Sequence, residues 1–273
     1  MSAPTTSEQF AAEAAVSTRG DGATVVLLLH GLGGDRHQPW GLLGEQTDPR
    51  LTLIAPDQRA HGETPVVGAA VDFRLDRLAD DAATLLSSRG LDGRPIVVVG
   101  ISMGAAVALR LLQRGTHDLR GGLLIRPAFE EVPWPEHLLV FQEIAALLRA
   151  EGAAGRETFL ESDSYRHVAA VSVGAAQSLL EQFTKPGSVE RVVRLENVPA
   201  NPSITWQAAW TPPCPVTVVG AEDDPVHPLR VAQLWHERIA TANLVRIPSR
   251  DRHPDEYAQA LFDLTHTHLD AWA

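Results

Sequence analysis

A serine flanked by glycines is the residue in this chain best suited to nucleophilic chemistry. Ser102 lies in the stretch Gly100-Ile101-Ser102-Met103-Gly104, directly after the apolar run IVVV. A serine hydroxyl is a weak nucleophile unless a base accepts its proton and N–H groups stabilise the developing oxyanion. A sharp strand-to-helix turn would expose the hydroxyl and aim the Met103 N–H at the same point. The flanking glycines fit such a turn, because the chain passes close to itself there.

Short apolar runs predict the strands that would hold Ser102 and its partners. They span residues 25–29, 51–55, 96–99, 122–125, 216–219 and 244–247. Continuously apolar runs are typical of parallel strands that helices cover on both faces. Segments with helical spacing separate them, at 75–86, 103–112, 229–239 and 255–272. The alternation predicts an α/β fold with a doubly wound, mostly parallel sheet.

A long stretch between the fourth and fifth predicted strands shows no clear strand pattern. Within it, residues 138–149 and 168–183 have helical spacing. A structureless loop of this length is unusual in a compact domain, so a helical insertion is expected. The sequence therefore predicts an α/β core formed by residues 1–126 and 211–273, with a helical cap or lid at residues 127–210.

The composition narrows the expected partners and the expected compartment. A net charge of −11 disfavours binding to nucleic acid or to an anionic membrane. Cys214 is the only cysteine, and the N-terminus shows neither a basic nor an apolar signal region, so a reducing, cytoplasmic location is expected. No residue pattern predicts a metal site or a bound cofactor. The expected partner is a small-molecule substrate, and nothing in the sequence indicates an oligomeric state.

Several segments resemble motifs of the α/β-hydrolase superfamily and occur in its order. The turn at Ser102 resembles the superfamily's nucleophile elbow, G-x-S-x-G. VVLLLHGLGG (25–34) resembles its first core strand and H-G oxyanion loop, and APDQRAHGET (55–64) resembles its segment D-x-R-G-H-G-x-S. The resemblance implies an oxyanion hole formed by the backbone N–H groups of Leu32 and Met103.

Two later segments resemble those that carry the acid and the base of the superfamily's triad. They are PVTVVGAEDDPVHP (215–228) and SRDRHPDEYAQAL (249–261). The superfamily's order of serine, acid and histidine implies a base that follows the acid in the chain. Among the eleven histidines, His253 is expected to be the base, since it alone lies in the loop after the last predicted strand; the alternative is a solvent-exposed loop histidine. Asp224, directly before Pro-Val, is the expected acid, with Asp223 as the alternative and Glu130 as a remote third candidate.

A triad of this kind implies a serine hydrolase. The expected reaction is cleavage of a carboxylic ester, lactone or thioester of a small apolar substrate through an acyl-enzyme on Ser102. The same triad is compatible with a carbon–carbon bond hydrolase or a cofactor-free perhydrolase. The fold is also compatible with a non-catalytic ligand-binding protein.

Aromatic side chains gather in and next to the predicted cap. They either wall an apolar pocket over Ser102 or bury the inner face of the cap itself. These residues are Trp134, Phe141, Phe159, Tyr165, Phe183, Trp206 and Trp210.

Overall fold

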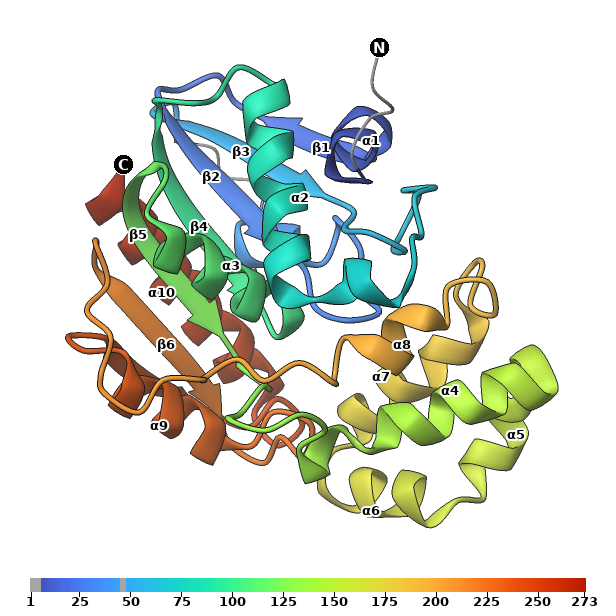
Figure 1. Cartoon of the computed structure of the whole chain (residues 1–273). Coiled ribbons are helices and arrows are strands. Elements are labelled where there is room, and N and C mark those ends of the chain that lie inside the picture. The colour runs from blue at the N-terminus through green and yellow to red at the C-terminus, as the bar shows by residue number, and fades with distance from the viewer. Residues whose placement is uncertain (1–5, 45–47) are drawn as a thin grey trace.

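A seven-stranded sheet forms the centre of the molecule (Figure 1). The computed structural model describes residues 6–44 and 48–273. The strands are arranged in the order β1-β3-β2-β4-β5-β6-β7, and β1 alone runs antiparallel to its neighbour. They are β1 (Val16–Arg19), β2 (Thr24–Leu29), β3 (Leu51–Pro56), β4 (Pro95–Ile101), β5 (Asp118–Ile125), β6 (Val216–Ala221) and β7 (Asn243–Ile247). The predicted α/β class and mostly parallel sheet are confirmed, and the predicted strands correspond to β2 through β7.

Helices cover both faces of the sheet. On one face lie α2 (Leu75–Ser88), α3 (Met103–Arg114) and α9 (Leu229–Arg238), and on the other lie η1 (Pro39–Leu42) and α10 (Pro254–Trp272). Successive side chains of β2 from Val25 to Leu29 alternate between these two layers and are all buried, which is why this run is continuously apolar. Two further elements, α1 (Thr6–Glu13) and η2 (Ala70–Phe73), flank α2. Within the part of the chain that the structure describes, no helix is both long and apolar enough to cross a bilayer.

The chain between β5 and β6 forms a group of helices beyond the carboxyl ends of the strands (Figure 1). Its elements are η3 (Glu136–Leu138), α4 (Val140–Glu151), η4 (Gly152–Ala154), α5 (Gly155–Leu160), α6 (Asp163–Val171), α7 (Val173–Thr184) and α8 (Val193–Asn197). The expected helix at 168–183 is broken at Ser172, whose Oγ accepts a hydrogen bond from the Ala175 N–H at 3.0 Å and caps α7. The division of the chain at residues 127 and 210 stays a prediction. This group of helices is called the cap below.

Glycine is required on both sides of the turn that carries Ser102. Ser102 itself has a φ of +53° and a ψ of −110°, a conformation that few residues adopt. A Cβ on Gly100 would lie 2.2 Å from the carbonyl oxygen of Gly104, and a Cβ on Gly104 would lie 2.2 Å from that of Leu29. Both obstacles are backbone atoms, so neither can move aside as a flexible side chain would.

Replacing Gly104 by alanine is therefore expected to destabilise the protein. Forcing one methyl group into this packed turn should lower the free energy of unfolding by about 1–3 kcal/mol. Urea unfolding followed by circular dichroism measures this change. Gly41→Ala is the matched control, because a Cβ at that position would meet no atom within 4 Å. Equal unfolding free energies for the two variants would show that the turn accommodates a side chain at position 104.

Candidate active site

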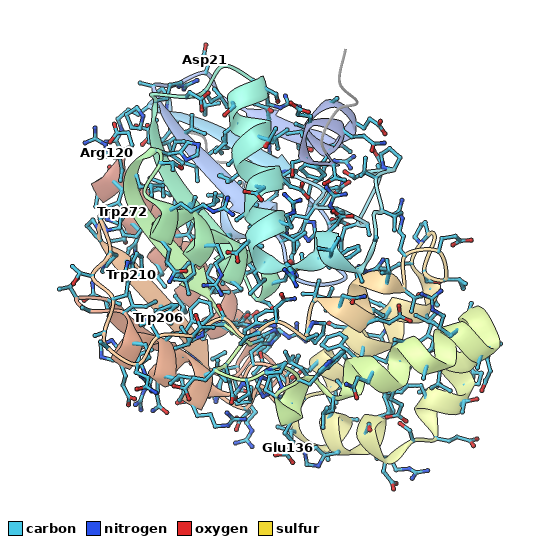
Figure 2. The ribbon with its side chains drawn as sticks, viewed as in Figure 1. Asp21, Arg120, Glu136, Trp206, Trp210 and Trp272 are labelled. Atoms are coloured by element: carbon cyan, nitrogen blue, oxygen red, sulfur yellow. The ribbon has the colours of Figure 1, made fainter. Side chains whose placement is uncertain are left out.

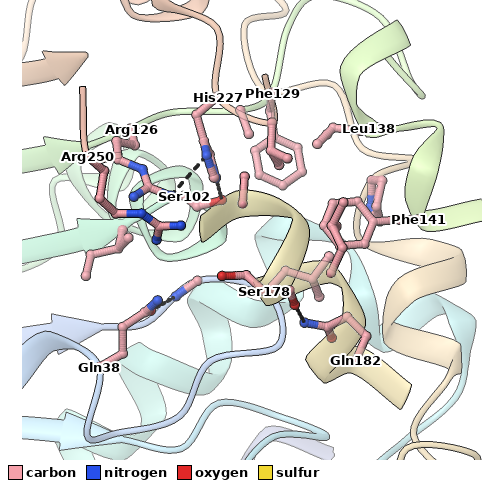
Figure 3. A pocket seen from close by; sticks show the side chains of 18 residues that line it. Gln38, Ser102, Arg126, Phe129, Leu138, Phe141, Ser178, Gln182, His227 and Arg250 are labelled. Carbon is pink, nitrogen blue, oxygen red and sulfur yellow. Dashed lines mark hydrogen bonds between the residues drawn. The ribbon is translucent and has the colours of Figure 1, made fainter. Parts of the chain in front are cut away.

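A cavity of about 110 Å³ lies at the edge of the sheet where the parallel strands end (Figure 3). Loops that follow β2, β4, β5, β6 and β7 line one side of it, and η3, α4 and α7 of the cap line the other. Loops at the carboxyl ends of parallel strands are where α/β proteins commonly bind ligands. The polar side chains that line the cavity are Gln38, Ser102, Arg126, Ser178, Gln182, His227 and Arg250.

Ser102, His227 and Asp224 form a chain of hydrogen bonds at this cavity, and Figure 3 shows its first two members. The Nε2 atom of His227 lies 2.9 Å from the Ser102 Oγ. On the other side of the ring, Nδ1 lies 3.0 Å and 3.1 Å from the two carboxylate oxygens of Asp224. The side chains of the histidine and the aspartate are only 10% and 11% exposed. The arrangement is that of a nucleophile, a base and an orienting acid.

The loop between β6 and α9 carries both His227 and Asp224 and fixes their relative positions by hydrogen bonds. The Asp224 Oδ1 accepts hydrogen bonds from the N–H groups of Val226 at 3.1 Å and His227 at 3.0 Å. The turn that these bonds close directs the imidazole back over the carboxylate. Pro228 then follows, and α9 begins at Leu229. The loop therefore delivers the acid and the base together.

The Arg126 guanidinium lies against the same pair. Its Nε is 3.1 Å from Asp224 Oδ2, and one of its terminal nitrogens is 3.1 Å from His227 Nδ1. Arginine is always protonated, so it competes with the ring for the carboxylate. An ionised carboxylate is a stronger acceptor than an imidazole nitrogen, so Nδ1 keeps its proton and donates to Asp224. Nε2 is then the acceptor that faces the Ser102 hydroxyl.

The electrostatics of the pair favour this charge state. Burial lowers the pKa of His227, and the charge of Arg126 lowers it further against the opposing effect of Asp224. Although burial alone would raise the pKa of Asp224, the charges of His227 and Arg126 hold it below its ordinary value. At neutral pH the carboxylate is ionised and the imidazole is neutral, which is the combination that a general base requires.

The pH dependence of any reaction at Ser102 should follow from these shifts. The imidazole must be unprotonated, so kcat/KM should fall as the pH drops through the pKa of His227, with a midpoint below the ordinary value of about 6.5. Arg126→Gln removes a cation that disfavours the imidazolium ion, so its midpoint should move to higher pH. Initial rates between pH 4 and 9 (about one reading per half unit) test both statements. A midpoint that moves to lower pH in Arg126→Gln would contradict this account of the site.

His253, the expected base, is not brought to Ser102. It is the N-cap residue of α10, directly before Pro254. Its N–H donates to the Ser249 carbonyl oxygen at 2.9 Å. Its side chain is 52% exposed, with Nδ1 3.6 Å from a carboxylate oxygen of Glu256. It does not line the cavity. The expected contact between His253 and Ser102 is therefore corrected: the loop after β7 turns at residues 249–252 and directs His253 to the surface, and His227 lies on the serine instead.

The acid candidates are separated clearly by position. Asp224 contacts the histidine that faces Ser102. Asp223 has a φ of +50° and lies 3.3 Å from the Arg252 guanidinium. Glu130 forms an ion pair with Arg230 and lies 3.5 Å from His137. Of these carboxylates, Asp224 alone contacts His227 in the described structure.

The amides expected to form the oxyanion hole are free to donate. In the described residues, neither the Leu32 N–H nor the Met103 N–H donates to a protein acceptor. Met103 begins α3, where amides have no intrahelical partner and the helix dipole favours negative charge. The neighbouring Gly31 N–H is already bonded to Gln38 Oε1 at 2.7 Å, which holds the loop that carries Leu32.

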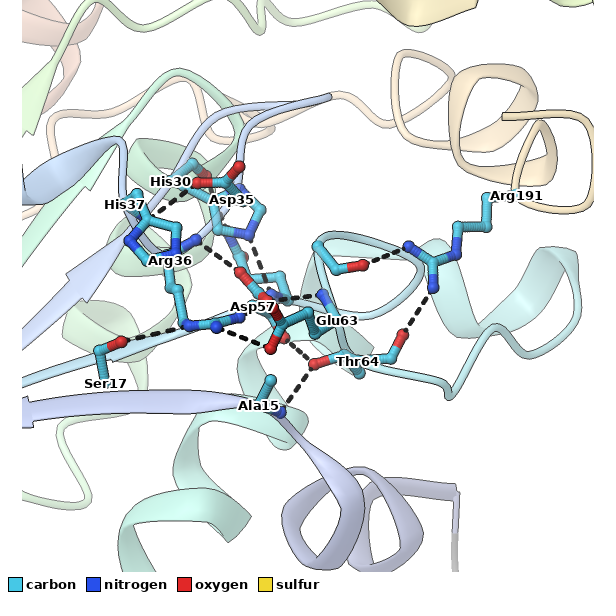
Figure 4. Close-up of polar contacts among 12 residues, drawn as sticks. Ala15, Ser17, His30, Asp35, Arg36, His37, Asp57, Glu63, Thr64 and Arg191 are labelled. Atoms are coloured by element: carbon cyan, nitrogen blue, oxygen red, sulfur yellow. Dashed lines mark hydrogen bonds and ion pairs between the residues drawn. The ribbon is translucent and has the colours of Figure 1, made fainter. Parts of the chain in front are cut away.

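The segment APDQRAHGET forms hydrogen bonds both with the loop after β2 and with Arg191 of the cap (Figure 4). Asp57 accepts hydrogen bonds from the backbone N–H and the guanidinium of Arg36 and from the Glu63 N–H. His30 accepts from the Gln58 N–H at 2.9 Å, and burial lowers its pKa to about 4, so it stays neutral. Arg191 of the cap donates to the carbonyl oxygens of Gly62 and Thr64. This segment therefore joins the oxyanion loop to the cap.

Most of the aromatic residues expected around the pocket lie elsewhere. Phe141 is the one among them that lines the cavity, together with Phe129 from the loop after β5. Phe159 packs inside the cap, with its ring 5.6 Å from that of Phe183. Trp206 and Trp210 lie beside α9, where the Trp206 indole donates to the Arg238 carbonyl oxygen (Figure 2). Burial of the cap's own face thus accounts for Phe159, Tyr165 and Phe183, and of the seven residues only Phe141 is part of the cavity wall among the described residues.

His227 is the functional residue that sequence reasoning missed. It follows Asp224 by three residues, within the segment that was expected to supply only the acid. It also satisfies the order serine, acid, histidine. A histidine within one turn of the acid, in a loop that ends at the same edge of the sheet as the serine, is the signal that would have identified it.

Comparisons with known proteins identify the family and the fold. The model of the alpha/beta hydrolase family matches residues 26–264. The lipase LipV of Mycobacterium tuberculosis is 34% identical over 107 residues, which are 39% of this chain and only 38% of the lipase. An esterase from Thermogutta terrifontis with malate bound has a TM-score of 0.66 at 22% identity, covering 93% of each chain. The enol-lactonase from Burkholderia xenovorans has a TM-score of 0.71 at 17% identity, covering 94% of this chain and 96% of its own. The two solved structures share the fold, the family model covers most of the sequence, and the chain therefore belongs to the alpha/beta hydrolase family.

Proposed function

We propose that this protein is a serine hydrolase that cleaves a carboxylic ester, lactone or thioester through an acyl-enzyme on Ser102. The observation that carries the proposal is the contact of 2.9 Å between the Ser102 Oγ and His227 Nε2, with Asp224 3.0 Å behind the ring. A hydroxyl exposed on a strained turn and hydrogen-bonded to a neutral, oriented imidazole has the arrangement of an activated nucleophile.

The reaction follows from these positions. His227 Nε2 takes the proton of Ser102 as Oγ attacks the acyl carbonyl carbon, and the N–H groups of Leu32 and Met103 stabilise the oxyanion. Asp224 stabilises the imidazolium ion that forms. The proton then passes from His227 to the leaving oxygen or sulfur atom, and the acyl group stays on Ser102. Water, deprotonated by His227, hydrolyses this acyl-enzyme and releases the acid.

The size and lining of the cavity favour a small acyl or ring portion. Its volume is about 110 Å³, and Phe129, Leu138 and Phe141 supply an apolar wall. An esterase and an enol-lactonase among the structural neighbours support the same bond classes. A panel of short-chain methyl esters, lactones and thioesters separates these possibilities.

The nucleophile can be tested without knowing the substrate. A fluorophosphonate probe should add one phosphonyl group to the folded wild-type protein, and peptide mass spectrometry should find it on Ser102. Ser102→Ala should take up none, because an alanine has no nucleophilic atom. The heat-denatured wild-type protein is the control for non-specific reaction. Equal labelling of the folded and denatured proteins would refute an activated serine and favour a non-catalytic ligand-binding protein.

A further inference from the structure

Arg250 is a charged side chain at the cavity that the proposed triad does not use. It belongs to the turn after β7 and lines the cavity together with Ser102 and His227 (Figure 3). It is close enough to the imidazole that its charge lowers the pKa of His227. Within the described chain, no carboxylate, carbonyl or hydroxyl oxygen accepts a hydrogen bond from its guanidinium. A guanidinium at a ligand cavity without a counter-charge can bind an anion.

The neighbours of Arg250 in the turn are already engaged, and they hold it in place. Asp251 accepts hydrogen bonds from the Ser172 hydroxyl and from the Gly174 N–H, the latter at 2.8 Å, at the beginning of α7. Arg252 pairs with Asp223 at 3.3 Å. A Cβ on Gly174 would come within 2.3 Å of a terminal nitrogen of Arg250, so the guanidinium packs directly on the cap backbone. Contacts with both the core and the cap thus fix the position of Arg250.

The charge balance of the cavity points to an anionic ligand. Among the described residues that line it, none is aspartate or glutamate. Arg126 is neutralised by Asp224, at 3.1 Å. In the described structure Arg250 forms no ion pair, because the carboxylate of the adjacent Asp251 is bonded to Ser172 and Gly174 instead. A cationic pocket in an acidic protein attracts and orients a negatively charged small molecule.

We propose that Arg250 binds a carboxylate carried by the substrate, so that the preferred substrates are half-esters of dicarboxylic acids or lactones that bear a carboxylate. This rests on the proposed function at Ser102. The carboxylate pairs with the guanidinium in the two-pronged geometry that arginine offers. The spacer runs from Arg250 to Ser102, where the ester carbonyl reacts, and the apolar wall of Phe129 and Phe141 lies on the other side of the serine (Figure 3). Arg250 is then a specificity residue that holds one end of the substrate while the other end reacts.

The binding arm of the test does not depend on turnover. Ser102→Ala protein is titrated calorimetrically with monomethyl succinate, glutarate and adipate, and with the neutral methyl ester of matched length for each. At least one half-ester should bind more tightly than its neutral partner, by about tenfold to a hundredfold. Adding Arg250→Met should abolish that difference, whereas adding Arg252→Met, which removes the same charge from the exposed side of the turn, should retain it.

The turnover arm separates this inference from the proposed function. In the wild-type protein, kcat/KM for the half-ester should exceed that for the neutral ester, and Arg250→Met should lose that ratio while Arg250→Lys should keep part of it. Hydrolysis of neutral esters without any preference that depends on Arg250 would overturn the inference and leave the hydrolase proposal standing. Half-ester binding that depends on Arg250, without hydrolysis of any ester, would support the carboxylate site and count against the hydrolase. Absence of half-ester binding at every chain length would overturn the inference.

Discussion

His227→Ala should reduce kcat/KM for the preferred ester by about ten-thousandfold or more, because it removes the only base in contact with the Ser102 hydroxyl in the described structure. His253→Ala should change it by no more than about twofold, since its exposed ring makes no contact with the cavity. Each substitution removes one imidazole side chain from the C-terminal third of the chain. They form a matched pair in which only position differs.

Steady-state rates on a methyl ester measure the pair, and circular dichroism shows whether each variant is folded. Exogenous imidazole should restore part of the activity of His227→Ala, because the substitution leaves space where the ring stood. Loss of activity in His253→Ala with retention in His227→Ala would mean that the turn at residues 249–252 rearranges on substrate binding. The assignment of the base to His227 would then fail.

Asp224→Asn should lower kcat by about ten-thousandfold. An amide cannot stabilise the imidazolium ion, and its NH₂ group would favour the tautomer in which Nε2 carries the proton and cannot accept one from Ser102. The substitution also leaves the Arg126 guanidinium without its counter-charge. Asp223→Asn is the matched control: its carboxylate pairs with Arg252 at the surface, so a change of about twofold or less is expected.

The same steady-state assay serves for this pair, with thermal unfolding to show how much stability each variant retains. An inactive Asp223→Asn beside an active Asp224→Asn would reverse the assignment of the acid. A folded Asp224→Asn variant with nearly full activity would mean that His227 does not need an ionised partner.

Much of the fold was predictable because its signals are local. Each strand from β2 to β7 contains a short apolar run, and in β2 and β6, which are buried at every residue, that run fills nearly the whole strand. The strand β1 escaped prediction because VSTR is short and only half-buried, and it pairs along one edge of the sheet. The prediction of one helix over 168–183 did not take account of Ser172, which caps the beginning of a new helix, α7.

The aromatic residues of the cap show where composition misleads. Their number in the sequence fits either a pocket wall or a small core, because both need large apolar side chains. Whether an aromatic side chain joins the pocket wall or the core of the cap depends on which face of its helix packs against the other cap helices. In the structure Phe159 and Phe183 meet each other, and Phe141 meets the cavity.

By itself the sequence determined the parallel sheet, the cap's helical character and the turn at Ser102, because periodicity and glycine spacing act over a few residues. It also favoured Asp224 over Asp223 as the acid of the triad, with Glu130 as a remote third candidate. Only the tertiary structure decided that His227 rather than His253 meets the serine, and that Arg250 lines the cavity without an ion-pair partner among the described residues. Parallel strands bring all their carboxyl-terminal loops to the same edge of the sheet, so chain order cannot tell which loop reaches inward. That choice depends on how each turn packs against the cap, through contacts such as those of Asp251 with the beginning of α7.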